Sequence, residues 1–186
     1  VIHANTIYKV WQDFLRTPYT SMFQGTSLAD GLDVTCGGSL GHSAAMGVSV
    51  GLVNCIDSLG AVEKVVFEDK KATMEELVAA LDNNFAGYET LQKALLQAPK
   101  YGTDSECVDK WIVPMEHTIN HEYLKYPMRF GRLRKNPVYI HLSAGVLYGS
   151  MMGATPDGRN AGMPLAEGGI SPMQGLALKG PSASMR

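Results

Sequence analysis

The sequence predicts an α/β fold in which helices dominate. Apolar residues recur every three or four positions over much of the 186-residue chain, as they do on the buried face of a helix. Two capping boxes, Thr73-x-x-Glu76 and Thr103-x-x-Glu106, mark the starts of two such segments. Residues 137–147 alternate instead between two uncharged sets of side chains, which predicts a strand that is buried on both faces.

The first third of the chain is predicted to hold two helices separated by a loop. Apolar residues at helical spacing predict a helix over residues 4–16, which Pro18 closes. Residues 24–47 are rich in glycine, serine and threonine, so we expect a loop with a short extended piece. A nearly continuous apolar run then predicts a buried helix from about Gly47 to Glu68.

Three further helices are expected in the middle of the chain. The first capping box opens a helix that Asn83-Asn84 ends, and residues 88–97 form a second short helix. The second capping box starts a third helix, in which Pro114 predicts a kink or break. The apolar faces of the first and third helices comprise Met74, Leu77, Val78, Leu81, Val108, Trp111, Ile112, Met115, Ile119 and Tyr123.

The predicted strand carries the candidate substrate-binding residues. His141, Ser143 and Gly145 share one face of it, and a polar face on a buried strand is typical of a cavity. We therefore expect these three residues to line a substrate cavity. The alternative is a buried histidine whose hydrogen bonds are satisfied locally. Because one strand cannot form a sheet alone, its pairing partners must come from elsewhere in a larger fold.

Composition excludes several classes of protein. Hydrophobic residues make up 45% of the chain and charged residues 18%, which fits a folded chain with a core. The net charge of −2 offers no basic field for nucleic acid, and the basic residues between Lys125 and Lys135 are interpreted as solvated surface. No run of about 18 apolar residues predicts a membrane span. Three cysteines without a C-x-x-C spacing predict neither a disulfide framework nor a zinc site and fit a reducing cytoplasm.

Isolated reactive side chains give weaker signals. Cys36 lies in a turn-like segment, where we favour a packed side chain over a reactive thiol. Cys55 is expected in the core, and Cys107 in the first turn of a helix. His117 and His121 have the i, i+4 spacing that can hold a metal, but no third ligand is evident nearby. We therefore expect two ordinary histidines and no metal site.

The run from Gly153 to Pro172 is the most informative segment. It reads Gly-Ala-Thr-Pro-Asp-Gly-Arg, followed by Ala-Gly-x-Pro-Leu-Ala-x-Gly-Gly-x-Ser-Pro. Each small residue stands beside a specific charged or apolar one, unlike the Gly and Ser repeats of a flexible linker. We predict an ordered loop that the rest of the protein holds, with several residues at positive φ.

Five motifs follow one another from about Gly25 to the end of the chain. They are Gly31-Leu32-Asp33-Val34-Thr35-x-Gly37-Gly38, the stretch from Val53 to Lys70, Asn83-Asn84-Phe85-x-Gly87-Tyr88-Glu89, Ala98-Pro99-Lys100-Tyr101-Gly102, and the run from Gly153 to Pro172 with Gly180-Pro181. Together they resemble the glycyl radical enzyme superfamily, the pyruvate formate-lyase-like group. Within that group the resemblance is closest to the branch of diol dehydratases and choline lyases.

The resemblance implies a ten-stranded α/β barrel wrapped by helices, of which residues 1–186 form a single partial domain. It implies a radical that is stored on a glycine, is passed to a cysteine inside the barrel, and is installed by a separate iron–sulfur enzyme using S-adenosylmethionine. Neither the family's cysteine–glutamate motif nor its radical-glycine motif occurs in residues 1–186. We therefore expect no catalytic residue and no bound cofactor in this window of a longer protein. The implied partners are a small-molecule substrate, the activating enzyme and a second copy in a homodimer.

The implied reaction is a radical elimination that cleaves a C–O or C–N bond of a small polar substrate. The form Pro164-Leu165-Ala166-x-Gly168-Gly169 favours elimination over acyl transfer to coenzyme A of the pyruvate formate-lyase type. A divergent, non-catalytic binding or scaffold protein is the other alternative. Three departures from the family pattern mildly favour such divergence: Ser39-Leu40 with His42 nearby, Pro114 in a segment that is normally a clean helix, and Gly145. Gly145 occupies a position where relatives often carry His or Asn, which leaves the substrate open.

Overall fold

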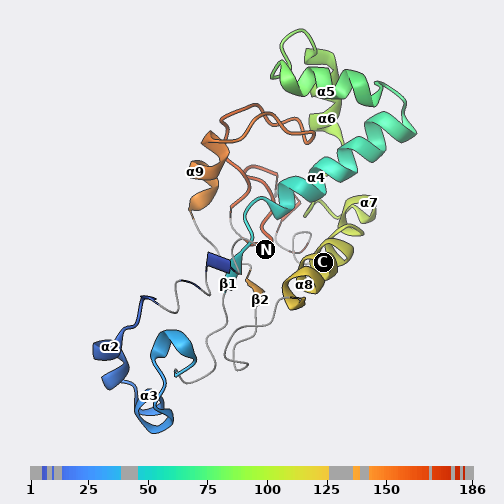
Figure 1. The fold of residues 1–186 in the computed structure, drawn as a ribbon. Coiled ribbons are helices and arrows are strands. Elements are labelled where there is room, and N and C mark those ends of the chain that lie inside the picture. The colour runs from blue at the N-terminus through green and yellow to red at the C-terminus, as the bar shows by residue number, and fades with distance from the viewer. Residues whose placement is uncertain are drawn as a thin grey trace. The chain divides into compact units, whose positions relative to one another are not determined.

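The computed structural model describes residues 6, 7, 10, 14–38, 46–125, 136–138, 143–167, 169–176, 179, 180 and 182. The chain divides into two units, the first formed by Val1–Gly47 and Glu116–Val138 and the second by Val48–Met115 and Tyr139–Arg186. Helices dominate the described residues, as the sequence predicts (Figure 1). Among the described helices, none has the length and apolar character that crossing a bilayer requires. The prediction of one partial domain over residues 1–186 stays a prediction.

In the predicted helix over residues 4–16, the described residues 6, 7, 10 and 14 are helical. Two short helices then follow where the sequence predicts an interruption. Pro18 does not only end a helix: it opens α2 (Pro18–Met22), because proline at the first helical position loses no intrahelical hydrogen bond. The loop predicted over residues 24–47 is wrong in its first part, since α3 (Gly25–Asp30) and the 3-10 turn η1 (Val34–Cys36) form there. Gly31, at φ 62°, ends α3 in the left-handed conformation.

A single carboxylate organises this part of the first unit. Asp33 accepts hydrogen bonds from the Thr17 amide at 2.8 Å, the Ser21 hydroxyl at 3.0 Å and the Thr35 amide at 2.9 Å. Burial opposes ionisation of this group, but the hydrogen bonds from Thr35, Thr17 and Ser21 outweigh it and lower the pKa of Asp33 to about 2. The first unit also holds β2 (Asn136–Val138) and most of β1 (Met46–Val48), which pair in a two-stranded sheet.

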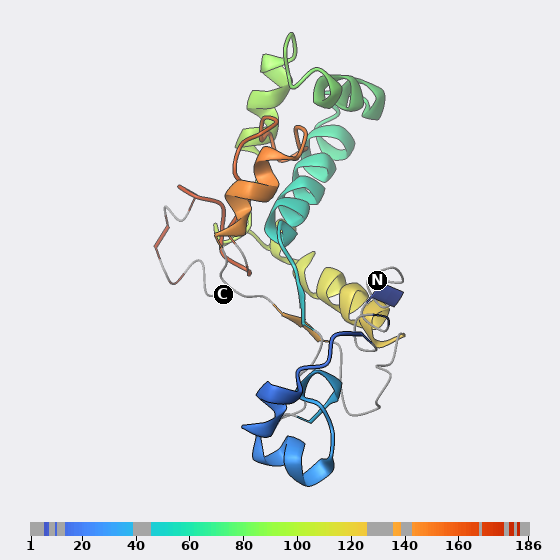
Figure 2. The same ribbon diagram turned by 60° about the vertical axis from the view of Figure 1, so that its left-hand side comes forward.

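The second unit is built around α4 (Leu52–Val62), which the π-helical turn η2 (Glu63–Glu68) continues. The predicted buried helix is confirmed, but it begins after Gly51, at φ 82°, and not at Gly47. Helices α5 (Met74–Asp82) and α6 (Glu89–Gln97) pack against it (Figures 1 and 2). The core of this unit includes Ala61, Val65, Val66, Leu77, Ala80, Phe85, Leu95 and Ala98.

The two predicted capping boxes have different outcomes. The first is confirmed: the Thr73 hydroxyl accepts from the Glu76 amide, and the Glu76 carboxylate accepts from the Thr73 amide. The second is wrong, because the Thr103 hydroxyl donates to the Lys100 carbonyl at 2.6 Å and Ser105 precedes the helix without a side-chain cap. The first helix also turns out to leave Met74 and Val78 exposed, while Leu77 is buried.

The predicted third helix is split in two. Helix α7 (Glu106–Asp109) is a single turn, and α8 (Ile112–Leu124) begins three residues after it. The predicted break therefore exists, but it precedes Pro114, which lies in the first turn of α8. Proline is tolerated in the first turn because the amide it lacks would have no intrahelical acceptor there.

The strand predicted over residues 137–147 is wrong at its end. Strand β2 covers Asn136–Val138, residues 139–142 lie outside the described residues, and α9 (Ala144–Ser150) is helical. Alternation of apolar and small residues fits a strand, but Gly145 and Gly149 also have i, i+4 spacing, and both are buried on one side of α9. The ten-stranded barrel goes beyond what the described residues contain and stays a proposal.

Candidate functional site

The predicted cavity residues do not share a strand face. Ser143 is exposed and precedes α9, and its side chain makes no capping hydrogen bond there. Gly145 lies inside α9 and is buried. His141 lies outside the described residues. The shared strand face is therefore wrong for Ser143 and Gly145, and a role of the three residues in substrate binding stays a prediction.

The glycines of α9 bring its backbone close to the loop that follows. The Leu165 amide donates to the Gly145 carbonyl at 3.0 Å. A Cβ atom added at Gly145 would lie 3.0 Å from the Leu165 carbonyl oxygen, and one added at Gly149 would lie 2.8 Å from the Pro164 Cα. Both distances are too short for a side chain without movement of the loop backbone. The close approach of α9 to the loop backbone therefore depends on Gly145 and Gly149.

The loop itself is ordered by its own hydrogen bonds, as predicted. The Thr155 amide donates to the Arg159 carbonyl, and the Gly158 amide to the Thr155 carbonyl, both at 3.0 Å. Asp157 accepts from the Thr155 hydroxyl at 2.5 Å and from the Arg159 amide at 3.2 Å. Gly158, at φ 96°, packs against Leu96 of α6 so closely that no side chain would fit. These contacts define the segment from Gly153 to Ala166, which we call the braced loop.

Arg159 closes the braced loop from within. Its guanidinium donates to the carbonyl oxygens of Gly153 and Met163, both at 2.5 Å, and to that of Asn160 at 3.2 Å. Its Nε donates to the Thr155 hydroxyl at 3.1 Å. Arg159 is only 6% exposed, so its guanidinium depends on these carbonyls for hydrogen bonds that water would otherwise supply.

Asn54 connects the braced loop to α4. Its Nδ2 donates to Asp157 Oδ2 at 2.8 Å, and its Oδ1 accepts from the Ala166 amide at 2.8 Å. Nδ2 also contacts the Met173 sulfur at 3.1 Å. Since Asn54 and Asp157 are both about 4% exposed, one buried side-chain amide fixes the loop to the helix at two points.

The α5–α6 region holds the other side of the braced loop. Asn84, at φ 50°, accepts from the Ala161 amide at 2.7 Å through its side-chain oxygen. Gln92 of α6 donates to the Gly158 carbonyl at 3.0 Å and to the Asn160 side chain at 2.5 Å. The orange loop accordingly runs beside α6 in both views (Figures 1 and 2).

The segment from Ala98 to Gly102 meets α4 at Asp57. Asp57 is fully buried and accepts from the Tyr101 amide at 2.7 Å through Oδ1, whereas its Oδ2 has no partner among the described residues. Burial raises the pKa of Asp57 to about 6, although the Tyr101 amide and the Lys100 ammonium both act to lower it. Lys100 is also buried and donates to the Leu95 carbonyl at 2.7 Å. Burial lowers the pKa of Lys100, against the attraction of Asp57 and Asp157.

Four of the five motifs therefore meet in one place, which we call the motif junction. They are the motifs that contain Asn54, Asn84, Lys100 and Asp157. The buried polar residues of the junction are Asn54, Asp57, Lys100, Asp157 and Arg159. The sequence marks each of them within a motif but does not show that they touch. Polar residues inside the apolar run of α4 are the signal that points to Asn54 and Asp57. With every charge buried and most of them bonded to backbone, the junction is arranged to hold segments together.

The cysteines and the histidine pair do not assemble a reactive centre within the described part of the chain. Cys36 is buried and accepts from the Arg16 guanidinium at 2.9 Å, as expected for a packed residue. Cys55 is exposed, so its predicted place in the core is wrong. Cys107 is exposed and lies in the first turn of α7, as predicted. No group of three or more His, Cys, Asp or Glu side chains that could hold a metal occurs among the described residues.

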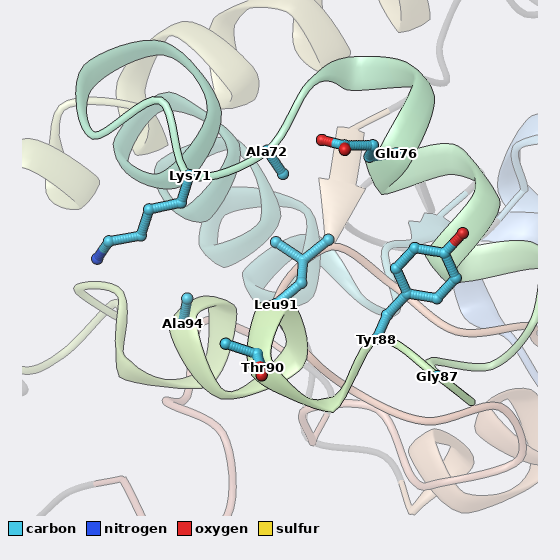
Figure 3. Close-up of a pocket in the computed structure, with 8 residues that line it drawn as sticks. All are labelled: Lys71, Ala72, Glu76, Gly87, Tyr88, Thr90, Leu91 and Ala94. Carbon is cyan, nitrogen blue, oxygen red and sulfur yellow. The ribbon is translucent and has the colours of Figure 1, made fainter.

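A pocket of about 380 Å³ lies between α5 and α6 (Figure 3). Leu91, Ala94 and Ala72 give it apolar walls, and the Tyr88 ring stands beside Leu91. Its charged members already have partners, because Glu76 caps α5 and Lys71 pairs with Asp69 at 2.9 Å. The pocket has the size of a small-ligand site, but its polar groups are not arranged for acid–base chemistry.

Comparison with known proteins places this geometry in a wider context. The family model described as pyruvate formate lyase-like matches residues 1–149. Isethionate sulfite-lyase of Bilophila wadsworthia is 41% identical over 134 residues, which are 72% of this chain and 16% of that enzyme. The glycerol-bound B12-independent glycerol dehydratase of Clostridium butyricum superposes with a TM-score of 0.85 at 34% identity, over 97% of this chain and 22% of that one.

A second solved structure agrees with the first. Hydroxyproline dehydratase of Clostridioides difficile, with trans-4-hydroxy-L-proline bound, superposes with a TM-score of 0.86 at 29% identity. The match covers 98% of this chain and 23% of the dehydratase chain. The chain thus spans less than a quarter of the length of each of these relatives.

Proposed function

The chain belongs to the pyruvate formate lyase-like family of glycyl radical enzymes, and from this premise we propose that the protein is a glycyl radical lyase or dehydratase acting on a small polar substrate. The observation that supports this proposal most directly is the superposition of 97–98% of the chain on two dehydratases, with TM-scores of 0.85 and 0.86. Isethionate sulfite-lyase is also an eliminating enzyme by its name. Loss of water and loss of sulfite share one requirement, a substrate radical next to the bond that breaks.

The proposed reaction begins and ends with transfer of a hydrogen atom between the substrate and a cysteine. A cysteine thiyl radical takes a hydrogen atom from a substrate carbon, leaving a thiol and a substrate radical. The bond from the neighbouring carbon to oxygen, nitrogen or sulfur then breaks, and the leaving group takes the electron pair. The hydroxyl or amine on the radical carbon loses a proton and forms a double bond to that carbon, so the unpaired electron moves to the neighbouring carbon. The product radical regains a hydrogen atom from the thiol, which restores the thiyl radical. Residues 1–186 contain neither radical-bearing motif, so in this proposal the described residues supply scaffold and not the reacting groups.

The motif junction supports this division of roles. Radical chemistry requires groups that are held rigidly and a site that excludes water. The braced loop is fixed to α4 by Asn54, to α6 by Gln92 and within itself by Arg159. We propose that this bracing holds α9 and the loop in place beside the substrate cavity. We propose in addition that the radical is installed by an iron–sulfur enzyme using S-adenosylmethionine and that the intact protein is a cytoplasmic homodimer.

The proposal is tested with the intact protein, produced without oxygen together with an activating enzyme. Electron paramagnetic resonance should show an organic radical on the protein after activation. The activated protein should then turn over at least one eliminable substrate from the set isethionate, glycerol, propane-1,2-diol and trans-4-hydroxy-L-proline. A radical without elimination, but with pyruvate- and coenzyme A-dependent acyl transfer, would identify the acyltransferase instead. Absence of a radical together with specific binding of a small ligand would identify a non-catalytic relative.

The binding residues are tested in the same active protein. If His141 lines the cavity, His141→Ala should raise KM or lower kcat by at least about tenfold, because a lost hydrogen bond to a polar substrate costs on the order of 1.5 kcal/mol. Ser143→Ala tests the second predicted binding residue in the same way, and Asp82→Asn on the exposed surface of α5 is the control that should leave KM and kcat unchanged. Unchanged kinetics for His141→Ala would leave that histidine with a structural role only.

A further inference from the structure

Helix α8 carries two exposed histidines whose rings face each other. His117 and His121 are one turn apart, their ring centroids are 6.4 Å apart, and their ring planes differ by only 7°. Both side chains are exposed, so neither ring is held by surrounding protein. The i, i+4 spacing alone is weak support for a shared function. The near-parallel arrangement of the rings is a separate observation, and it shows that both point to the same side of the helix.

From this geometry we propose that His117 and His121 form a two-point chelate for a divalent transition metal of the Cu²⁺, Ni²⁺ and Zn²⁺ class. Imidazole nitrogen is a preferred ligand of these ions, and bonds of about 2.0–2.1 Å to zinc bring the two nitrogens within about 4 Å of each other. Exposed histidines reach that separation by rotating about their side-chain torsions, without movement of the helix backbone. Water completes the coordination, because no third protein ligand joins the pair among the described residues.

Acidic side chains next to the pair favour a cation. Glu116 and Glu122 each lie beside one of the two histidines in the sequence. The Asn120 amide donates to Glu116 at 3.1 Å, which keeps that carboxylate on the helix surface.

Exposed thiols must be removed before the metal is added, because Cys55 and Cys107 are exposed and also bind these ions. The experiment therefore uses the full chain with Cys55→Ser and Cys107→Ser as the parent. Isothermal titration calorimetry at pH 7.5 measures Cu²⁺ and Zn²⁺ binding. We expect Cu²⁺ to bind more tightly than Zn²⁺, in keeping with the general affinity order of these metals. His117→Ala and His121→Ala should each weaken Cu²⁺ binding by on the order of 100-fold, because a chelate becomes a single imidazole.

A matched variant separates geometry from histidine content. His121→Ala combined with Glu122→His keeps the number of imidazoles but turns the second one about 100° around the helix. It should bind as weakly as the single-alanine variants. Circular dichroism checks that each variant keeps its helix content, and Zn²⁺ should raise the melting temperature of the parent alone. Equal Cu²⁺ affinity in the parent and in the displaced variant, or equal affinity after His117→Ala, would overturn the proposal.

Discussion

The two units of the chain are stabilised in different ways. The second unit buries a row of apolar side chains between α4, α5 and α6 and adds a junction of buried polar residues. In the described part of the first unit, the large apolar side chains face outward: Phe14 is 80% exposed, and Tyr19 and Phe23 are each 74% exposed. Hydrogen bonds to the Asp33 carboxylate are prominent among its internal contacts, and Thr26 and Ser27 donate further hydrogen bonds to the Gly38 carbonyl. The comparison teaches that burial of apolar side chains and hydrogen bonding to a polar side chain can stabilise different parts of one chain. Each kind of stabilisation leads to a separate prediction.

The largest expected effect is on the apolar core. Phe85 is 2% exposed in the second unit, whereas Phe23 is 74% exposed in the first, so the pair offers the same chemical change in two environments. Phe85→Ala should lower the free energy of unfolding by about 3–5 kcal/mol, and Phe23→Ala by no more than about 0.5 kcal/mol. Urea denaturation of the two variants measures both values. Similar losses for the two would show that the first unit buries Phe23 in solution and would break the comparison.

The second expected effect is on the motif junction. Arg159→Ala removes the donor of three part-buried carbonyl groups and should cost about 2–3 kcal/mol. Because the hydrogen bonds that Arg159 donates all lie within the braced loop, the loss should appear as faster hydrogen exchange in peptides from residues 153–166. Peptides from residues 18–36 should change little. Arg159→Lys keeps the charge but not the forked geometry, so it should restore only part of the protection. Uniform acceleration across both units would contradict the local role of Arg159.

Sequence periodicity correctly predicted the helices that bury one apolar face. It gave a wrong prediction where close backbone contacts determine the local structure. The run around Ile56 and the capping box at Thr73 specify local structure through their own side chains, and both helices form. Helix α9 has no such signal, because its packing depends on two glycines that bring its backbone against Pro164 and Leu165 of a distant segment. Alternation of residue types then predicted a strand by default. The capping box predicted at Thr103 was wrong for a similar reason, because the Thr103 hydroxyl donates to the Lys100 carbonyl and does not cap the helix.

The motif junction could be predicted only as a set of separate pieces. Asn54 and Asp57 stand out as polar residues within an apolar helix, and the glycine-rich run was predicted to be ordered. The pairing of Asn54 with Asp157, however, joins residues that are 103 positions apart. No local pattern encodes which distant motif a buried amide will meet. Tertiary contacts of this kind follow from the fold as a whole.

A third effect depends on pH and belongs to the second unit. Burial raises the pKa of Asp57 to about 6, above its ordinary value of 3.8. The folded protein then binds more protons than the unfolded chain between about pH 4 and pH 6. The stability of the second unit should therefore fall as pH rises through this window, by about 2 kcal/mol. Urea denaturation followed by Trp111 fluorescence, in a Trp11→Phe background, measures the change.

Substitution at Asp57 identifies the group responsible for that slope. Asp57→Asn keeps an acceptor for the Tyr101 amide but cannot titrate, so most of the dependence between pH 4 and pH 6 should disappear. Burial also raises the pKa of Asp109 in the same unit, and that carboxyl should carry the remainder. Asp82→Asn on the exposed surface of α5 is the matched control and should leave the slope as it is. If the full pH dependence of stability between pH 4 and pH 6 survives Asp57→Asn, another titrating group is responsible for it.

The smallest expected effect has the opposite sign and belongs to the first unit. Hydrogen bonds from Thr35, Thr17 and Ser21 outweigh burial and lower the pKa of Asp33 to about 2, below its ordinary value of 3.8. The unfolded chain therefore binds more protons than the folded one in this window, and stability should be lost as pH falls from about 4 to about 2. Because Asp33 is only partly buried, solvent screening limits the loss to about 1 kcal/mol.

Hydrogen exchange of peptides from residues 18–36 measures the loss after correction for intrinsic rates. Asp33→Asn should remove this acid sensitivity, while Asp30→Asn, on an exposed residue of α3, should not. Acidification to pH 4 should thus strengthen the unit that has a buried core and leave the other unchanged, and further acidification should loosen only the unit that Asp33 organises. A common response of both units to acid would mean that Asp57 and Asp33 do not control the stability of their own units.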